Sequence, residues 1–329
     1  MPKVFPFLMR KLVRMLLLLL CASMLTFLLV SLSPVDPLQV NVGQAALGQL
    51  SPEQVERLRA FWGVDEPLLD RFLAWGSGFL RGDMGISLRY RQPVATIIWE
   101  KLSNSIVLLA LSWVVSGLLG FALGVISGAC EGRWPDKLIR GYSLLIASTP
   151  TFWLAILLLL VFAVWVPVLP IGLSVPIGME ASAVTFADTL RHAILPALAL
   201  SITGTASITL HTRRKMMDAM HSDYALFAAA RGDSKARIAL RHGVRNVLLP
   251  AITLQFASIG EIIGGSVLVE QVFSYPGLGQ AAVTAGLGGD VPLLLGVTVT
   301  CAAIVFLGNF AADILYGVID PRMRRRKAS

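Results

Sequence analysis

Residues 223–250 read Asp-Tyr-Ala-Leu-Phe-Ala-Ala-Ala-Arg-Gly-Asp-Ser-Lys-Ala-Arg-Ile-Ala-Leu-Arg-His-Gly-Val-Arg-Asn-Val-Leu-Leu-Pro. This basic stretch lies between two long apolar segments, and its pattern predicts two short helices joined by a tight corner. Gly232 suits the left-handed residue just past a helix end. Ser234 can then cap the second helix. Basic residues recur every four positions on that helix and are expected to form one charged stripe: Arg237, Arg241 and Arg245.

Two roles fit this stretch on residue chemistry alone. A pair of short helices with a glycine corner and small alanines suits close docking onto another protein. A basic, partly apolar segment also suits the surface of a membrane, where it would rest on anionic lipid headgroups. The residue types by themselves leave both interpretations open.

Composition identifies an integral membrane protein. The chain has 329 residues, of which 55% are hydrophobic and only 15% are charged, whereas soluble proteins average roughly 25% charged residues. The apolar residues come in blocks of about 20, the length needed to cross a bilayer. A fold exposed to water on all sides is therefore excluded.

The apolar blocks predict six membrane-spanning helices, and the basic loops predict their orientation. The spans are expected at 12–32, 104–130, 141–168, 188–212, 247–272 and 291–318. Lysines and arginines concentrate in the N-terminal tail, the 131–140 and 213–246 loops and the C-terminal tail. Because basic loops stay in the cytoplasm, both termini are expected inside. Topology thus explains the net charge of +8, and a nucleic-acid partner is not needed.

Four parts are expected along the chain. Residues 1–32 hold the N-terminal tail and the first transmembrane helix, and residues 33–103 form an external segment. Residues 104–322 form a five-helix transmembrane core that contains the loop at 223–250. Residues 323–329 are a basic cytoplasmic tail.

Local patterns predict details within these parts. In the external segment, Ser51-Pro52-Glu53-Gln54 predicts a helix start with a cap, a first-turn proline and a capping-box partner. A second short helix is expected from Pro67 to Leu80. In the second span, glycines at four-residue spacing predict a smooth stripe where another helix approaches closely: Gly120, Gly124 and Gly128. Pro150 is expected to kink the third span.

Two acids occupy the fifth span, Glu261 near its middle and Glu270 at its outer end. A carboxylate in lipid costs a few kcal/mol, so Glu261 should face the bundle interior or water. It either lines a translocation path or is a buried hydrogen-bonding residue that fixes the helix register. Glu270 is expected to reach the headgroups.

Catalytic and cofactor motifs are absent from the sequence. The phosphate loop, the His-Glu-x-x-His and Gly-x-Ser-x-Gly patterns, and Cys-x-x-Cys do not occur. The three cysteines are far apart, and the four histidines are scattered. The sequence therefore predicts neither an enzyme nor a bound metal or cofactor. If the chain takes part in ATP-powered transport, the hydrolysis must occur on another subunit.

The order of several short motifs resembles one transporter family. Ala228-x-Ala230-x-Gly232, followed by a basic helix that ends in Leu-Leu-Pro, resembles the cytoplasmic coupling loop of ABC importer permeases, in their dipeptide, oligopeptide and nickel branch. The family signature begins Glu-Ala-Ala, whereas no glutamate precedes the alanines here. Three further stretches also resemble that branch: the strip 81–88, the aromatic-Pro-Gly turn at 273–279, and Asp320-Pro321-Arg322.

This resemblance implies an all-α type I ABC importer permease with six transmembrane helices and an external helical segment between the first two. It further implies a bacterial inner-membrane complex with a second homologous permease, two ATP-binding subunits and an extracytoplasmic solute-binding protein. The positions matched to ATPase coupling are Ala228, Ala230, Gly232 and Asp233. Charge adds Arg231 and Arg237 to this set.

Other functions and several cargoes stay open at this stage. A secondary transporter could use Glu261 as its ion-coupled carboxylate, although no clear inverted repeat relates the two halves. A membrane enzyme built on the external segment would lack catalytic residues. The cargo of the importer is a peptide, nickel or a metal chelate, and the stretch 260–265 slightly favours the nickel-type members.

Overall fold

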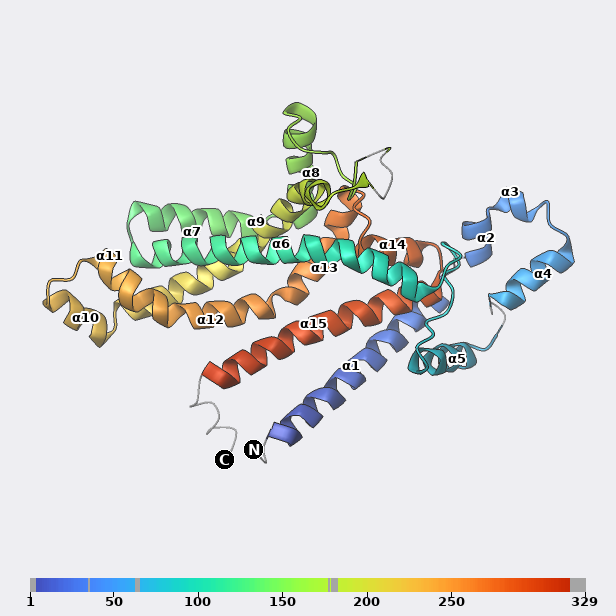
Figure 1. Cartoon of the computed structure of the whole chain (residues 1–329), viewed down its shortest axis with the longest axis horizontal. Coiled ribbons are helices and arrows are strands. Elements are labelled where there is room, and N and C mark those ends of the chain that lie inside the picture. The colour runs from blue at the N-terminus through green and yellow to red at the C-terminus, as the bar shows by residue number, and fades with distance from the viewer. Residues whose placement is uncertain (1–3, 35, 63–65, 177, 179–182, 320–329) are drawn as a thin grey trace. The chain divides into compact units, whose positions relative to one another are not determined.

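The computed structural model describes residues 4–34, 36–62, 66–176, 178 and 183–319 (Figure 1). Within these residues every regular element is a helix, and the only bridged extended pair is Ile86 with Pro93. The predicted all-α fold is confirmed. The Asp320-Pro321-Arg322 motif and the tail at 323–329 lie outside the described residues.

The chain divides into two compact units, Met1–Ser105 with Pro276–Phe306, and Ile106–Tyr275 with Leu307–Ser329. The first unit contains α1 (Val4–Ser31), α2 (Pro37–Val42), α3 (Gln44–Leu47), α4 (Pro52–Phe61), α5 (Leu68–Leu80), the start of α6 (Val94–Ala129), α14 (Leu278–Leu287) and the start of α15 (Val291–Ile319). The second contains the rest of α6, α7 (Trp134–Ala147), α8 (Thr151–Leu159), α9 (Phe186–Met220), α10 (Asp223–Ala230), α11 (Lys235–Ile238), α12 (Val244–Ala257), α13 (Ile259–Val272), the end of α15, and two π-helical turns, η1 (Leu160–Trp165) and η3 (Ala239–Gly243).

The two short helices predicted between the first and second spans are present in the first unit. The capping box of α4 is complete, because the Ser51 hydroxyl accepts from the Gln54 backbone N–H at 3.3 Å and the Gln54 side-chain oxygen accepts from the Ser51 N–H at 2.9 Å. Helix α5 packs against α1, with the ring centroids of Phe72 and Phe27 5.3 Å apart. Aromatic contacts therefore attach this segment to the first span.

A buried carboxylate organises the loop that precedes α6. Asp290 is fully buried and accepts hydrogen bonds from the Ser87 hydroxyl at 2.5 Å, from the Arg89 N–H at 3.1 Å and from the Leu293 N–H at 3.2 Å. Burial raises the pKa of the Asp290 carboxyl, and these hydrogen bonds act in the opposite direction. The same side chain thus caps the start of α15 and ties the 87–89 loop to it.

Helix α9 is the centre of the second unit. Helices α7, α8, α10, α12 and α13 all pack against it, and Figure 1 shows the ribbons of α6, α7, α9 and α12 gathered in one bundle. The helix runs without a break through Pro196, which is buried inside it. Its position allows it to connect the basic loop with the bent helices further along the bundle.

The predicted glycine stripe of α6 packs directly on α9. A Cβ atom added at Gly120 would lie 2.9 Å from the Cβ of Ile208, and one added at Gly124 would lie 2.5 Å from the Cβ of Thr212. Gly128 approaches the next turn of α9 just as closely. These contacts leave no room for a side chain, so the stripe sets how near the two helices come.

The described residues contain four uninterrupted helices long and apolar enough to cross a membrane: Met9–Ser31, Val94–Ala129, Phe186–Met220 and Val291–Leu315. Two more spans are formed only if bent pairs are counted, which makes up to six. Trp134–Ala147 and Thr151–Trp165 meet at 101°, and Lys235–Ala257 and Ile259–Val272 meet at 47°. The chain is a membrane-spanning protein.

Two span boundaries differ from those expected. Helix α6 begins at Val94, so the predicted boundary at residues 103 and 104 falls inside a helix. The third span, expected as one kinked helix over 141–168, is instead two helices separated by Ser148–Pro150. Proline lacks a backbone N–H and disfavours helical geometry in the residue before it, which explains a break and not merely a kink.

Replacing Gly124 with leucine should destabilise the helix bundle, because the new side chain would overlap Thr212. We expect a loss on the order of 1–3 kcal/mol, seen as a lower Tm of the detergent-purified chain. Gly141→Leu is the matched control, since Gly141 is also helical and has no atom within 4 Å of its added Cβ. Equal Tm values for the two variants would contradict the assigned packing.

Candidate functional site

The basic loop turns at a glycine corner of defined geometry. Helix α10 ends at Ala230, and Gly232 follows with φ of +89°, the left-handed conformation expected there. The Asp233 N–H donates to the Ala228 carbonyl at 3.1 Å and the Gly232 N–H to the Ala229 carbonyl at 2.9 Å. These two bonds form the Schellman arrangement that ends a helix.

The second half of the loop begins as predicted and then departs from a regular α-helix. The Ser234 hydroxyl accepts from the Arg237 N–H at 3.4 Å and caps α11. The π-helical turn η3 follows and leads into α12. Arg237, Arg241 and Arg245 are all exposed, but the π-turn between them shifts the helical register, so they do not form a straight row.

The predicted coupling residues divide between the surface and the interior of this loop. Ala230, Arg231 and Gly232 are exposed. Asp233 is partly buried and forms an ion pair with exposed Arg237 at 3.1 Å. Ala228 is fully buried. It packs with Ala225, Ile238 and Met220 and holds the two short helices together.

Large apolar side chains are exposed on both sides of the corner along the chain, and the sequence analysis did not single them out. They are two leucines and a phenylalanine: Leu226 is 62% exposed, Phe227 72% and Leu240 70%. Exposed Arg231 lies in the same loop, beside the glycine. We call these four residues the loop face. Val247, further along the chain, is by contrast 2% exposed.

The loop is attached firmly to the bundle. The Asn246 side-chain amide donates to the Tyr224 hydroxyl at 3.0 Å and joins α12 to α10. A side chain at Gly243 would overlap Met216 of α9, so η3 lies directly on the central helix. These contacts present the loop face on a supported element.

A buried ion pair at the same end of α9 was not predicted. Asp136 is 2% exposed, and the Arg213 guanidinium donates to its two oxygens at 2.6 and 2.8 Å. The Ser127 hydroxyl and the Gly132 N–H donate to the same carboxylate at 2.6 and 2.9 Å. One side chain therefore ties α6, the 130–133 turn, α7 and α9 together. The pairing joins positions 77 residues apart, and no local pattern indicates it.

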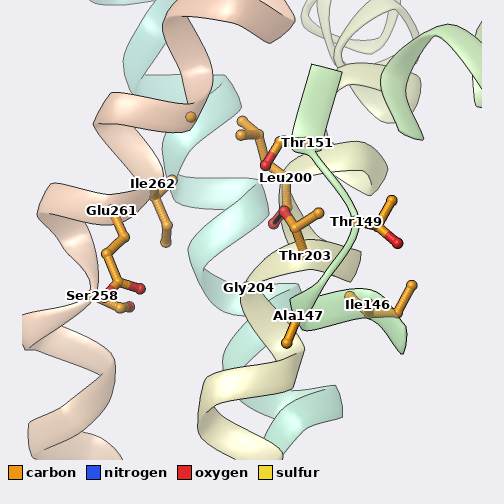
Figure 2. Close-up of a pocket in the computed structure, with 11 residues that line it drawn as sticks. Ile146, Ala147, Thr149, Thr151, Leu200, Thr203, Gly204, Ser258, Glu261 and Ile262 are labelled. Carbon is orange, nitrogen blue, oxygen red and sulfur yellow. Dashed lines mark hydrogen bonds between the residues drawn. The ribbon is translucent and has the colours of Figure 1, made fainter. Parts of the chain in front are cut away.

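Glu261 lines a polar hollow of about 220 Å³ within the second unit (Figure 2). Figure 2 shows Glu261 and Ser258 on one wall, with Thr203 and Gly204 of α9 and Thr151 at the start of α8 on the other. Both bent helix pairs thus border the same space. The carboxylate is exposed and has no hydrogen bond or ion pair with any described residue.

Glu270 does not line the hollow, and its burial differs from the expectation. It is fully buried, whereas the sequence analysis placed its carboxylate among the headgroups. Its backbone carbonyl accepts from the Tyr275 N–H at 2.8 Å, and burial raises the pKa of the Tyr275 phenol to about 12. Among the described residues, no group of three or more His, Cys, Asp or Glu side chains could hold a metal ion.

The loop and the hollow lie at opposite ends of α12. This helix begins at Val244, directly after η3, and ends at Ala257, just before Ser258 in the hollow. Its 14 residues correspond to about 21 Å at 1.5 Å per residue. A displacement of the loop can therefore reach the hollow along a single helix.

Known proteins resemble the chain along nearly its whole length. The family model described as "Binding-protein-dependent transport system inner membrane component" matches residues 120–325, and the model of the corresponding N-terminal region matches residues 4–109. The oligopeptide transport system permease protein AppB of Bacillus subtilis is 33% identical over 92% of this chain and 93% of its own. The glutathione transport system permease protein GsiC of Escherichia coli is 33% identical over the same shares.

Asp136→Asn should destabilise the junction of α6, α7 and α9, because it leaves the Arg213 charge without its buried partner. Loss of one partner from a buried pair costs about 3–5 kcal/mol, so the Tm of the purified chain should fall clearly. Lys137→Gln changes the neighbouring exposed charge and should leave the Tm nearly unchanged. A similar Tm for both variants would show that the ion pair contributes little.

Proposed function

The chain belongs to the family of binding-protein-dependent transport system inner membrane components, the permeases of ABC importers, and on this premise we propose that it is one of the two permease subunits of an ATP-driven peptide importer. A second homologous permease would complete the translocation pathway. Two separate ATP-binding subunits would hydrolyse ATP, and a solute-binding protein would deliver the cargo from outside.

The loop face is the observation that carries the proposed coupling to the ATPase. Three large apolar side chains beside an exposed arginine match the composition of protein interface centres, where aromatic residues and arginine are enriched. The Schellman corner and the support from α9 favour docking of a preformed surface over adsorption to lipid. Arg231 and Arg237 would lie at the rim, and Asp233 would hold Arg237 in place.

The proposed transmission of motion follows the helix that leaves this loop. ATP-driven closure of the two ATPases would move the loop face, and α12 would carry that displacement to Ser258 and Glu261. The 47° bend after α12 supports a change of direction at this point. We therefore propose that the hollow belongs to the translocation path and opens alternately to the two sides of the membrane.

The proposed orientation puts both termini and the basic loop in the cytoplasm of a bacterial cell. The segment at 33–103 would then lie outside, where it is available to the solute-binding protein. The concentration of lysine and arginine in the tails and in two of the loops supports this arrangement. Membrane lipid would surround the helix bundle.

We propose a peptide as the cargo, in preference to nickel. The relatives are named for oligopeptide, peptide and glutathione transport. A bare metal ion would need several His, Cys or carboxylate ligands on its path, and the described residues offer no such group. Family membership likewise favours ATP-driven import over a secondary transporter that uses Glu261.

Uptake into cells lacking the native gene tests this function. Cells with the chain and its partner subunits should accumulate labelled di- or oligopeptide several-fold above cells without the chain, and labelled nickel should stay at background. The parallel nickel measurement decides between the two cargoes. Accumulation of nickel alone, or of neither label, would contradict the proposed peptide import.

Phe227→Ala should weaken the association with the ATPase and leave the folded permease intact, because this ring is 72% exposed. Loss of an interface anchor of this kind costs about 2 kcal/mol or more, which is over tenfold in affinity. Co-purification of the ATP-binding subunits from membranes measures the effect. Leu145→Ala in α7 is the control, since that side chain is 68% exposed but distant in sequence from the loop. Equal recovery of the ATPase with both variants would exclude Phe227 as an anchor.

A further inference from the structure

The polar side chains around the Glu261 hollow include a negative charge but no positive one. They supply one carboxylate and four hydroxyl groups, and none of the lining residues is Lys, Arg or His: the polar members are Thr149, Thr151, Thr203, Ser258 and Glu261. The remaining lining residues are aliphatic or glycine. Nothing on these walls neutralises the carboxylate.

Three of the four hydroxyl groups act mainly as acceptors towards the hollow, because their protons are already donated to backbone carbonyls. Thr149 donates to the Leu145 carbonyl at 2.9 Å, and Ser258 donates to the Gln255 carbonyl at 2.8 Å. Thr203 donates to carbonyls one turn back on α9 at 3.1 Å. Since each oxygen keeps a free lone pair, the walls present acceptors and one negative charge.

This combination selects among possible occupants. An anion would meet the negative charge of Glu261 and no cationic side chain, and Thr151 has the only lining hydroxyl whose proton is not already donated to a backbone carbonyl. A transition metal would find a single carboxylate and no imidazole or thiolate, which is too few ligands. An ammonium group, with a positive charge and three N–H donors, matches one carboxylate and several hydroxyl acceptors.

We propose that the hollow binds the protonated primary amine of a cargo molecule, with Glu261 as its counter-ion and the hydroxyl oxygens of Thr203 and Ser258 as acceptors. This inference rests on the proposed role in peptide import, because the α-amino group of a peptide is largely protonated at neutral pH. It extends that role by naming the part of the cargo that the permease itself contacts.

The size of the hollow agrees with an end group. Its volume of about 220 Å³ is below the roughly 300–1,000 Å³ of sites that enclose a whole drug-sized ligand. The amino end of a peptide fits this space, and the rest of the molecule would extend beyond it. Peptides of different length and sequence share this end, so one small site serves many cargoes.

A thiol placed in the hollow measures its charge without relying on transport. Ala147→Cys, at a lining residue outside the proposed amine contacts, is introduced into a chain whose natural cysteines, Cys21, Cys130 and Cys301, are replaced by serine. The assembled transport complex in membranes is treated with aminoethyl and sulfonatoethyl methanethiosulfonate, which carry opposite charges. The measured quantity is the rate of thiol labelling by the cationic reagent divided by the rate for the anionic reagent. With Glu261 present, this ratio should be roughly fivefold or more higher than in the Glu261→Gln variant.

Matched variants and ligands test the assignment further. Glu261→Asp keeps the charge and should keep the preference. If Glu261→Gln fails to assemble, Glu261→Ala provides the uncharged background. Glu100→Gln removes an exposed carboxylate of α6 and should leave the ratio unchanged. Dialanine should slow labelling by the cationic reagent, and N-acetyl-dialanine, which lacks the ammonium group, should not.

The outcomes separate this inference from the proposed function. A thiol that reacts with neither reagent, a ratio that Glu261→Gln does not change, or equal protection by the two peptides would each overturn the amine site. Chain-dependent peptide uptake combined with any of these results would leave the proposed function standing. A Glu261-dependent ratio and selective protection by dialanine, without peptide uptake, would instead overturn the proposed transport and leave the amine site.

Discussion

Close contact between α6 and α9 is the constraint on which the second unit depends. In a bilayer the hydrophobic effect does not drive helices together, so van der Waals packing and buried polar bonds must do so. The glycine stripe that includes Gly124 lets the two backbones approach closely. The buried ion pair of Asp136 with Arg213 adds a polar contact near the C-terminal end of α9. Because α7, α8, α10, α12 and α13 all rest on α9, an error in this contact would displace both the basic loop and the hollow.

The breaks in the helices give this bundle its polar interior. In a continuous helix the backbone N–H and C=O groups bond to each other, so only side chains contact the lipid or neighbouring helices. An interruption leaves some of these backbone groups unpaired and is tolerated only where protein or water surrounds it. The interruption at 148–150 and the bend at Ser258 both border the hollow, as does Thr203 of α9. Glu261 therefore occupies one of the few places in the bundle where an unpaired carboxylate can be accommodated. The loop and the hollow are mechanically related because α12 alone separates them.

Local features of the candidate site were predictable, and contacts between elements were not. The left-handed Gly232 and the Ser234 cap follow from interactions within a single turn, so the residues themselves specify them. The burial of Ala228 and the exposure of Phe227 depend on which face of α10 meets α11 and α9, and neighbouring alanines look alike in sequence. The motif therefore predicted the corner between the two short helices, whereas the burial of Ala228 within the loop could not be read from it.

The sequence by itself determined the membrane class, the helical spans, the glycine stripe and the family, because each follows from composition, periodicity or short motifs. Only the tertiary structure decided where the charged groups lie. Asp136 meets a partner 77 residues away, and Glu270 is buried where its position at the end of a span predicted the headgroups. It also decided that Glu261 faces hydroxyl groups contributed by three separate parts of the chain. The physical reason is that hydrophobic length and turn chemistry are local quantities, whereas the environment of a charge depends on every helix packed around it.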